Sequence, residues 1–259
     1  MRLIRMLWLM LLLAPWPAQG ADLAEIVARG SVRIGVCLGF EPMGFRDSNN
    51  QPRGYDVDVA TLAAEALGLP LELVEVNPIS LRASLVADQF DFAACGITVT
   101  PRRARDVDFS LPYLRTGLKL LVPRQSTLGG LADLVPGTRV VVLRDTTAEA
   151  LVRERAPGAE VIYVGNPSDA LLMLHQGQAA AYVEDALGVD HLAGRYPEEL
   201  IALPEVYSSD AIGLLLAKGH PNLLRWLDIF ASTFVSSGDY AVTYAKWWKG
   251  APPPISTPW

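Results

Sequence analysis

The sequence has 259 residues, of which 51% are hydrophobic and 19% are charged, and its formal net charge is −6. This length is enough for one large folded domain or two small ones, each with a sizeable core. An acidic chain without a basic block is a poor candidate for binding nucleic acid or an anionic membrane surface. We therefore expect no nucleic-acid partner.

The first twenty residues have the organisation of a secretory signal peptide. Arg2 and Arg5 give a basic start, residues 7–13 form an unbroken apolar run, and small residues follow up to Gly20. The apolar run is shorter than the roughly 18 residues that a membrane span requires. We expect cleavage near Gly20 and export to the periplasm. Without the two arginines, 20 basic residues face 28 acidic ones, a net charge of −8.

The rest of the chain alternates predicted strands with predicted helices. The first series has apolar strand segments at 32–37, 71–74 and 90–95, with helical segments at 56–67 and 81–87 between them. The pattern then restarts, with strands predicted at 119–122, 139–143, 161–164, 179–183 and 211–217, and helices at 147–155, 167–176 and twice within 222–248. Such alternation indicates an α/β fold with parallel strands and helices on both faces. Two successive series indicate two similar lobes.

Polar residues with complementary chemistry follow the predicted strands, where ligands bind in open α/β sheets. Gly96 lets the backbone approach a ligand closely, and Thr98 offers a hydroxyl beside it. Arg103 can hold a carboxylate through two hydrogen bonds. Thr147 begins a helix, whose N-terminus favours an anionic group, while Asp185 can accept from an ammonium. This combination fits a zwitterion.

Each of these residues also has a local explanation. Thr147 and Asp185 can simply cap the helices that they precede. Arg103 can be a solvated turn residue, and Phe40, which follows the first strand, can be part of the core. These alternatives stay open at this point.

We find no catalytic constellation, cofactor motif or metal site. The sequence has neither a G-x-S-x-G elbow nor a phosphate-binding loop. Its two cysteines lack zinc-ligand spacing, and none of its three histidines lies near either cysteine. We expect neither a metal nor a cofactor.

The chain resembles the family 3 extracellular solute-binding proteins, the polar amino-acid receptors of ABC importers. The resemblance extends from Gly30 to Gly250, and its pieces arrive in the family's order. They are GSVRIGV at 30–36, PMGF at 42–45, GYDVDVA at 54–60, GITVTPRR at 96–103, VDFSLPY at 107–113, TTAE at 146–149, GDY at 238–240 and WW at 247–248.

The resemblance implies a two-lobed periplasmic binding protein of type II. We expect the protein to be a monomer. Each lobe would be a mostly parallel sheet flanked by helices, with the ligand between the lobes. After the signal peptide at 1–20, residues 21–112 and 212–259 would form lobe 1 and residues 117–206 lobe 2. A two-segment hinge would lie at 113–116 and 207–211.

The resemblance also implies roles for the residues at the strand ends. Arg103 matches the arginine that grips the ligand's α-carboxylate, with Gly96 and Thr98 as backbone and hydroxyl contacts beside it. Thr147 matches the lobe 2 helix N-terminus that meets the same carboxylate. Asp185 matches the carboxylate that takes the α-ammonium. Phe40 lies where an aromatic ring packs on the ligand, and Glu184 would favour a cationic ligand side chain.

Three positions depart from the family pattern. Cys37 stands where many relatives have a polar contact, Asp145 replaces a glycine before the two threonines, and residues 77–81 lack an aromatic side chain. In this fold Cys37 and Cys95 would lie on neighbouring strands at the edge of the cleft. They would form either a disulfide or two small residues lining the pocket.

We therefore predict a protein that closes two lobes around a small, amino-acid-like solute and presents it to the membrane permease of an ABC importer. Two alternatives remain. One is a binding module that serves a periplasmic dehydrogenase or a sensor. The other is an enzyme like the cyclohexadienyl dehydratases, which resemble these receptors.

Overall fold

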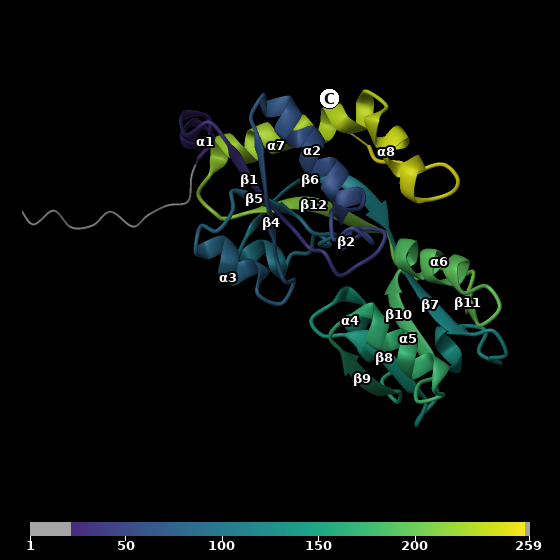
Figure 1. Ribbon diagram of the computed structural model, residues 1–259. Coiled ribbons are helices and arrows are strands. Elements are labelled where there is room, and N and C mark those ends of the chain that lie inside the picture. Colours follow the sequence, from purple (N-terminus) through teal and green to yellow (C-terminus); the bar gives the residue numbers. More distant parts are fainter. Residues whose placement is uncertain (1–21, 257–259) are drawn as a thin grey trace, which may run out of the picture.

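The computed structural model describes residues 22–256, so the predicted signal peptide at 1–20 lies outside the described residues. The described chain forms two five-stranded sheets, each with its own helices (Figure 1). Within this part of the chain, no helix is both long and apolar enough to cross a membrane. The predicted α/β architecture with two lobes built on separate sheets is thereby confirmed.

We define lobe 1 by the sheet with strand order β4-β1-β5-β12-β6. Its strands are β1 (Val32–Val36), β4 (Leu71–Glu75), β5 (Phe92–Ala94), β6 (Asp108–Thr116) and β12 (Asp210–Leu216). Its helices are α1 (Leu23–Arg29), α2 (Tyr55–Leu67), α3 (Leu81–Val86), α7 (Pro221–Ser236) and α8 (Asp239–Trp247). A small hairpin, β2 (Phe45–Arg46) and β3 (Pro52–Arg53), lies between β1 and α2.

Lobe 2 is built on the sheet with strand order β11-β7-β10-β8-β9. Its strands are β7 (Leu118–Pro123), β8 (Arg139–Leu143), β9 (Glu160–Val164), β10 (Ala181–Asp185) and β11 (Leu200–Ala202). Its helices are α4 (Thr147–Arg155), α5 (Pro167–His175) and α6 (Ala186–Arg195).

Both sheets are mixed, but four of the five strands in each run in the same direction, as expected for mostly parallel sheets. In lobe 1, β4, β1 and β5 are parallel, whereas β12 runs antiparallel to both β5 and β6. In lobe 2, β10, β8 and β9 are parallel, whereas β7 runs antiparallel to β10 and β11. The reversed strands are β12 in lobe 1 and β7 in lobe 2. Each begins where the chain has just crossed from one lobe to the other.

The core of each lobe lies on both faces of its sheet. Successive side chains of a strand point to opposite faces. In β5, Phe92 and Ala94 join the cluster beneath α1, α2, α7 and α8, whereas Ala93 packs with α3 on the other face. Lobe 2 repeats this arrangement, with α4 on one face and α5 and α6 on the other.

The two connections between the lobes run side by side. Residues 113–116 and 210–211, which we predict to belong to the hinge, are strand residues of β6 and β12, which pair from Asp210↔Thr116 onward. The backbone therefore changes lobe at Gly117, where a Cβ atom would lie 2.3 Å from the carbonyl oxygen of Ser208. No side chain fits at so close an approach, which explains the glycine.

The lobes also exchange apolar side chains. Phe40 of lobe 1 packs against the α5–α6 core of lobe 2, and Leu187 of lobe 2 lies in the main core of lobe 1. The indole Nε1 of Trp248 donates to the carbonyl oxygen of Leu187 at 3.2 Å. These contacts hold the start of α6 against lobe 1.

A disulfide joins Cys37 to Cys95, with their Cα atoms 5.0 Å apart. The two residues follow the last paired residues of the parallel neighbours β1 and β5, Val36 and Ala94. The bond thus ties together the two strand ends that lead to Phe40 and to Gly96.

Candidate functional site

A cavity between the lobes, which we call the inner cavity, lies where several strands of both sheets end. It encloses about 510 Å³ of space, including the part that opens to solvent. Lobe 1 contributes Phe40, Glu41, Met43, Gly96, Leu114, Thr116 and Ile212, and lobe 2 contributes Pro167, Tyr182, Glu184, Asp185, Leu187, Gly188 and Leu192. Most of these side chains are apolar, and every charged one is acidic.

A second, more open space between the lobes, the outer cleft, has the opposite charge balance. It encloses about 850 Å³ and is lined by Thr100, Arg102, Arg103, Asp145, Thr146, Thr147, Glu149, Ala150 and Arg153. Three arginines here face two acidic residues, so the cleft is positive where the inner cavity is negative.

The predicted site residues divide between these two spaces. Phe40, Gly96, Glu184 and Asp185 line the inner cavity. Arg103 and Thr147 line the outer cleft. Thr98 lines neither; its side chain is buried and its carbonyl oxygen accepts from Arg103 Nη1 at 2.9 Å. Sequence reasoning missed Tyr182, Pro167 and Leu192, whose common position depends on how α5 and α6 pack on β10.

Asp185 lies at the boundary between β10 and α6 and lines the inner cavity from the lobe 2 side. It occupies the N-cap position of α6, but its side chain makes no capping hydrogen bond. Its Oδ1 atom is buried and has no hydrogen-bond partner among the described residues. Burial, followed by the negative charges of Glu184 and Asp210, raises the pKa of Asp185 well above its usual value, while Arg103 opposes the shift. Local capping therefore does not explain this residue.

Glu184 lies beside Asp185 and is held by two donors. The Tyr182 hydroxyl donates to its Oε2 at 2.6 Å, and the Asp185 amide donates to its Oε1 at 3.0 Å. Burial raises the pKa of Glu184, and these two hydrogen bonds oppose the shift. The inner cavity thus holds two adjacent carboxyl groups, of which the one on Asp185 lacks a partner.

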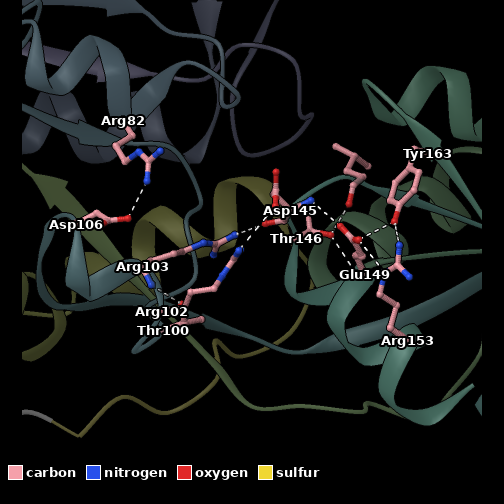
Figure 2. Close-up of polar contacts among 11 residues, drawn as sticks. Arg82, Thr100, Arg102, Arg103, Asp106, Asp145, Thr146, Glu149, Arg153 and Tyr163 are labelled. Carbon is pink, nitrogen blue, oxygen red and sulfur yellow. Dashed lines mark hydrogen bonds and ion pairs between the residues drawn. The ribbon is translucent and has the colours of Figure 1, made fainter. Parts of the chain in front are cut away.

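Arg103 reaches from lobe 1 toward the start of α4 in lobe 2 (Figure 2). Its Nη1 donates to Thr98 and its Nη2 donates to the carbonyl oxygen of Asp145 at 3.1 Å. Burial and the charge of Arg102 lower the pKa of Arg103, whereas Asp185, Asp145 and Asp210 raise it. An arginine remains protonated under such conditions, so a cation lies between the two spaces.

The helix start opposite Arg103 is capped by Thr146, not by Thr147. The Thr146 hydroxyl oxygen accepts from the Glu149 amide at 3.2 Å, and Glu149 Oε2 accepts from the Asp145 amide at 2.7 Å (Figure 2). Thr147 is the first helical residue and lines the outer cleft, so a capping role does not account for it.

The backbone conformation of Asp145 explains why the family pattern has a glycine at this position. Its φ is +60°, in the left-handed region that glycine favours and that aspartate tolerates better than most residues. Its carboxylate is largely exposed and lies 3.8 Å from Arg102 Nη1. The additional negative charge therefore faces Arg102 and solvent.

A buried aspartate lies directly behind Gly96. Asp56 Oδ1 accepts from the Tyr113 hydroxyl at 2.7 Å, and that hydroxyl accepts from the Gly96 amide at 3.4 Å. Asp56 Oδ2 has no hydrogen-bond partner among the described residues, and a Cβ on Gly96 would lie 3.9 Å from it. Burial raises the pKa of Asp56 to about 7, against the opposing contacts from Tyr113 and Gly96.

This raised pKa predicts a pH-dependent stability that Asp56→Asn removes. The folded protein keeps the Asp56 proton up to about pH 7, whereas the unfolded chain loses it near the ordinary value of 3.8. Stability from this group is therefore present at low pH and is lost as the pH rises to about 7, by about 1.4 kcal/mol per pH unit. Urea unfolding from pH 5 to pH 8 measures the slope for the wild type and the variant.

Glu65→Gln, which alters an exposed side chain on the same helix, serves as the control. We expect the control to keep the wild-type slope and Asp56→Asn to flatten it. An unchanged slope in Asp56→Asn would show that the ionisation of Asp56 does not govern stability in this range.

The described residues 22–256 contain no group of three or more His, Cys, Asp or Glu side chains that could hold a metal ion. The site offers carboxylates, an arginine and apolar walls. These can bind an ammonium in the inner cavity and a carboxylate toward the outer cleft.

Comparison with known proteins places this geometry in a family. The chain is 27% identical over 235 residues to the ABC transporter glutamine-binding protein GlnH of Bacillus subtilis, covering 89% of this chain and 85% of that protein. It is 26% identical over 223 residues to the virulence sensor protein BvgS of Bordetella pertussis, where the match covers 85% of this chain but only 18% of the sensor.

A solved structure shares the fold at similar identity. The ancestral amino acid-binding protein AncCDT-1, described as a precursor of cyclohexadienyl dehydratase, aligns with a TM-score of 0.81 and 30% identity. The alignment covers 87% of this chain and 99% of that one. Residues 32–250 match the bacterial extracellular solute-binding proteins, family 3. Because this match spans most of the chain, the protein belongs to that family.

Proposed function

We propose that this protein captures an amino acid or a similar small polar solute between its two lobes in the periplasm and delivers it to an ABC importer. The observation that carries the proposal is the buried, unpartnered Oδ1 of Asp185 in a cavity between the lobes. A buried carboxylate without a partner is costly, and a ligand ammonium supplies the missing partner.

The charge distribution gives the ligand a direction. The ammonium lies with Asp185 in the inner cavity, and the carboxylate points toward Arg103 and Thr147 at the positive outer cleft. The ligand thus contacts both lobes. Because contacts with both lobes exist only in the closed form, ligand binding favours closure.

A thermal-shift screen over the twenty amino acids, polyamines and small organic acids tests the proposal. A ligand present at 100 times its dissociation constant should stabilise the protein by about 2.7 kcal/mol. We expect amino acids to give the largest shifts. A screen in which only organic acids stabilise the protein would contradict the assignment of Asp185 to an ammonium.

Delivery to an importer is the part of the proposal that concerns partners. A family 3 domain can also form part of a sensor, as the match within BvgS illustrates. Permease and ATPase genes beside the gene for this chain would support transport. A neighbouring dehydrogenase gene or a fused kinase domain would favour an accessory or sensor role.

A second candidate is a dehydratase on the same scaffold, favoured by the adjacent, partly buried carboxyl groups of Glu184 and Asp185. Their raised pKa values favour the protonated form that a general acid needs. Incubation with prephenate tests this candidate, because loss of water and carbon dioxide yields phenylpyruvate. Formation of phenylpyruvate that Glu184→Gln or Asp185→Asn abolishes would establish it.

A further inference from the structure

The walls of the inner cavity suit a ligand with more than one positive charge. Its charged lining residues are Glu41, Glu184 and Asp185, and none of the basic side chains of residues 22–256 lines it. Glu41 is already paired with Arg195, so Glu184 and Asp185 are the carboxyl groups available to a ligand. Arg103 lies outside, with its guanidinium bonded to Thr98 and Asp145. One ammonium can compensate Asp185, which leaves the partly buried carboxyl of Glu184 without a hydrogen-bonded cation among the described residues.

Glu184 is positioned as a binding group in its own right. Tyr182 and Glu184 lie two residues apart on β10, so their side chains share one face of the sheet, and both line the inner cavity. The Tyr182 hydroxyl and the Asp185 amide fix the two carboxylate oxygens by hydrogen bonds. Pro167, Gly188 and Leu192 complete the lobe 2 wall around this pair without adding charge.

From this arrangement we infer that Tyr182 and Glu184 form a subsite for a cationic group at the end of the ligand's side chain. The ligand is then a basic amino acid, with its α-ammonium on Asp185, its terminal cation on Glu184 and an aliphatic chain along the apolar wall. This inference rests on the proposed function, because it takes the Asp185 position for the α-ammonium from there.

A neutral side chain of the same length should bind less well. It would not form the charged hydrogen bond with Glu184 that a terminal cation forms, and such a hydrogen bond contributes about 1.5–3 kcal/mol. At 1.36 kcal/mol per tenfold change, this predicts that L-lysine binds roughly 10- to 150-fold more tightly than L-norleucine.

Isothermal titration calorimetry with L-lysine, L-arginine, L-norleucine and cadaverine tests the inference on the wild type, Glu184→Gln and Asp185→Asn. We expect Glu184→Gln to abolish the preference for lysine over norleucine while norleucine still binds, which also shows that the variant is folded. Asp185→Asn should weaken binding of all the amino acids. Equal affinities for lysine and norleucine in the wild type, or a preference that survives Glu184→Gln, would overturn the subsite.

Proton release provides an independent readout. The groups that face Glu184 are the Asp185 carboxyl and the Tyr182 hydroxyl, with Arg103 and Asp210 beyond Asp185. Lys119 lies opposite Glu184 on the neighbouring strand β7, and its ammonium is paired with Asp190 at 2.8 Å. Burial favours the protonated acids in the free protein, so a cation should displace protons when it binds. Titrations at pH 6 in buffers of different ionisation enthalpy count these protons, and Glu184→Gln should release fewer.

The same measurements separate failure of this inference from failure of the proposed function. If cadaverine binds and no amino acid does, and Glu184→Gln abolishes cadaverine binding, then the subsite stands and the amino-acid proposal falls. If norleucine binds as tightly as lysine, then the subsite falls and the amino-acid proposal stands. If none of these compounds binds but another amino acid stabilises the protein in the thermal-shift screen, then the subsite falls and the amino-acid proposal stands. If no amino acid binds in either measurement, both are wrong.

Discussion

Arg103→Ala should weaken binding of the ligand by roughly 30-fold to several thousand-fold. Truncating one partner of a buried, hydrogen-bonded charge pair costs about 2–5 kcal/mol, and each 1.36 kcal/mol is a tenfold change. Arg103 is also the side chain that bridges Thr98 in lobe 1 to Asp145 in lobe 2. Its loss removes both the proposed ligand contact and an interlobe hydrogen bond.

Arg102→Ala is the matched control for this change. Arg102 is the neighbouring arginine, its side chain is 66% exposed, and its ion pair with Asp145 spans 3.8 Å. Exposed pairs of this kind contribute at most about 1 kcal/mol. Titration calorimetry of both variants should therefore show a large loss of affinity for Arg103→Ala only. Equal losses, or no loss in either, would contradict the assignment of the ligand carboxylate to Arg103.

Replacing both Cys37 and Cys95 with serine should lower the free energy of unfolding by roughly 4 kcal/mol. The bond closes a loop with a sequence separation of 58 residues, and cross-linking a loop of that length reduces the entropy of the unfolded chain by about that amount. Urea unfolding measures the difference. Adding a reductant should lower the stability of the wild type to that of the double variant and leave the variant unchanged.

The disulfide prediction also concerns the site, since the bond ties the ends of β1 and β5. In the double variant, the free energy of ligand binding should change by less than the free energy of unfolding does, because Arg103 and Asp185 remain in place. An unfolding midpoint that neither the substitutions nor the reductant changes would show that the disulfide does not stabilise the fold.

Local sequence signals predicted several helices and strands at the positions where the structure has them. The β-branched run 139–143 and the helix from Thr147 occur as predicted, as β8 and α4. By contrast, local signals did not predict β6, which runs from Asp108 to Thr116 through Pro112. A proline is tolerated there because β6 is the edge strand of its sheet.

The candidate site was only partly predictable for a similar reason. Arg103 and Asp185 follow strands, so their position near the cleft follows from the general topology of α/β sheets. The division into a negative inner cavity and a positive outer cleft depends on how α4, α5 and α6 pack, which no local pattern specifies. Tyr182 illustrates this, because within β10 it is indistinguishable from a core residue until Glu184 is placed beside it.

Hydrogen exchange with and without the ligand identified by screening tests the two-lobed capture most directly. Closure around a ligand should protect backbone amides in both lobes, around residues 95–103 in lobe 1 and around 145–149 and 184–189 in lobe 2. Asp185→Asn should remove the protection in both lobes at the same ligand concentration. Protection confined to one lobe, or to a surface away from these segments, would contradict capture between the lobes.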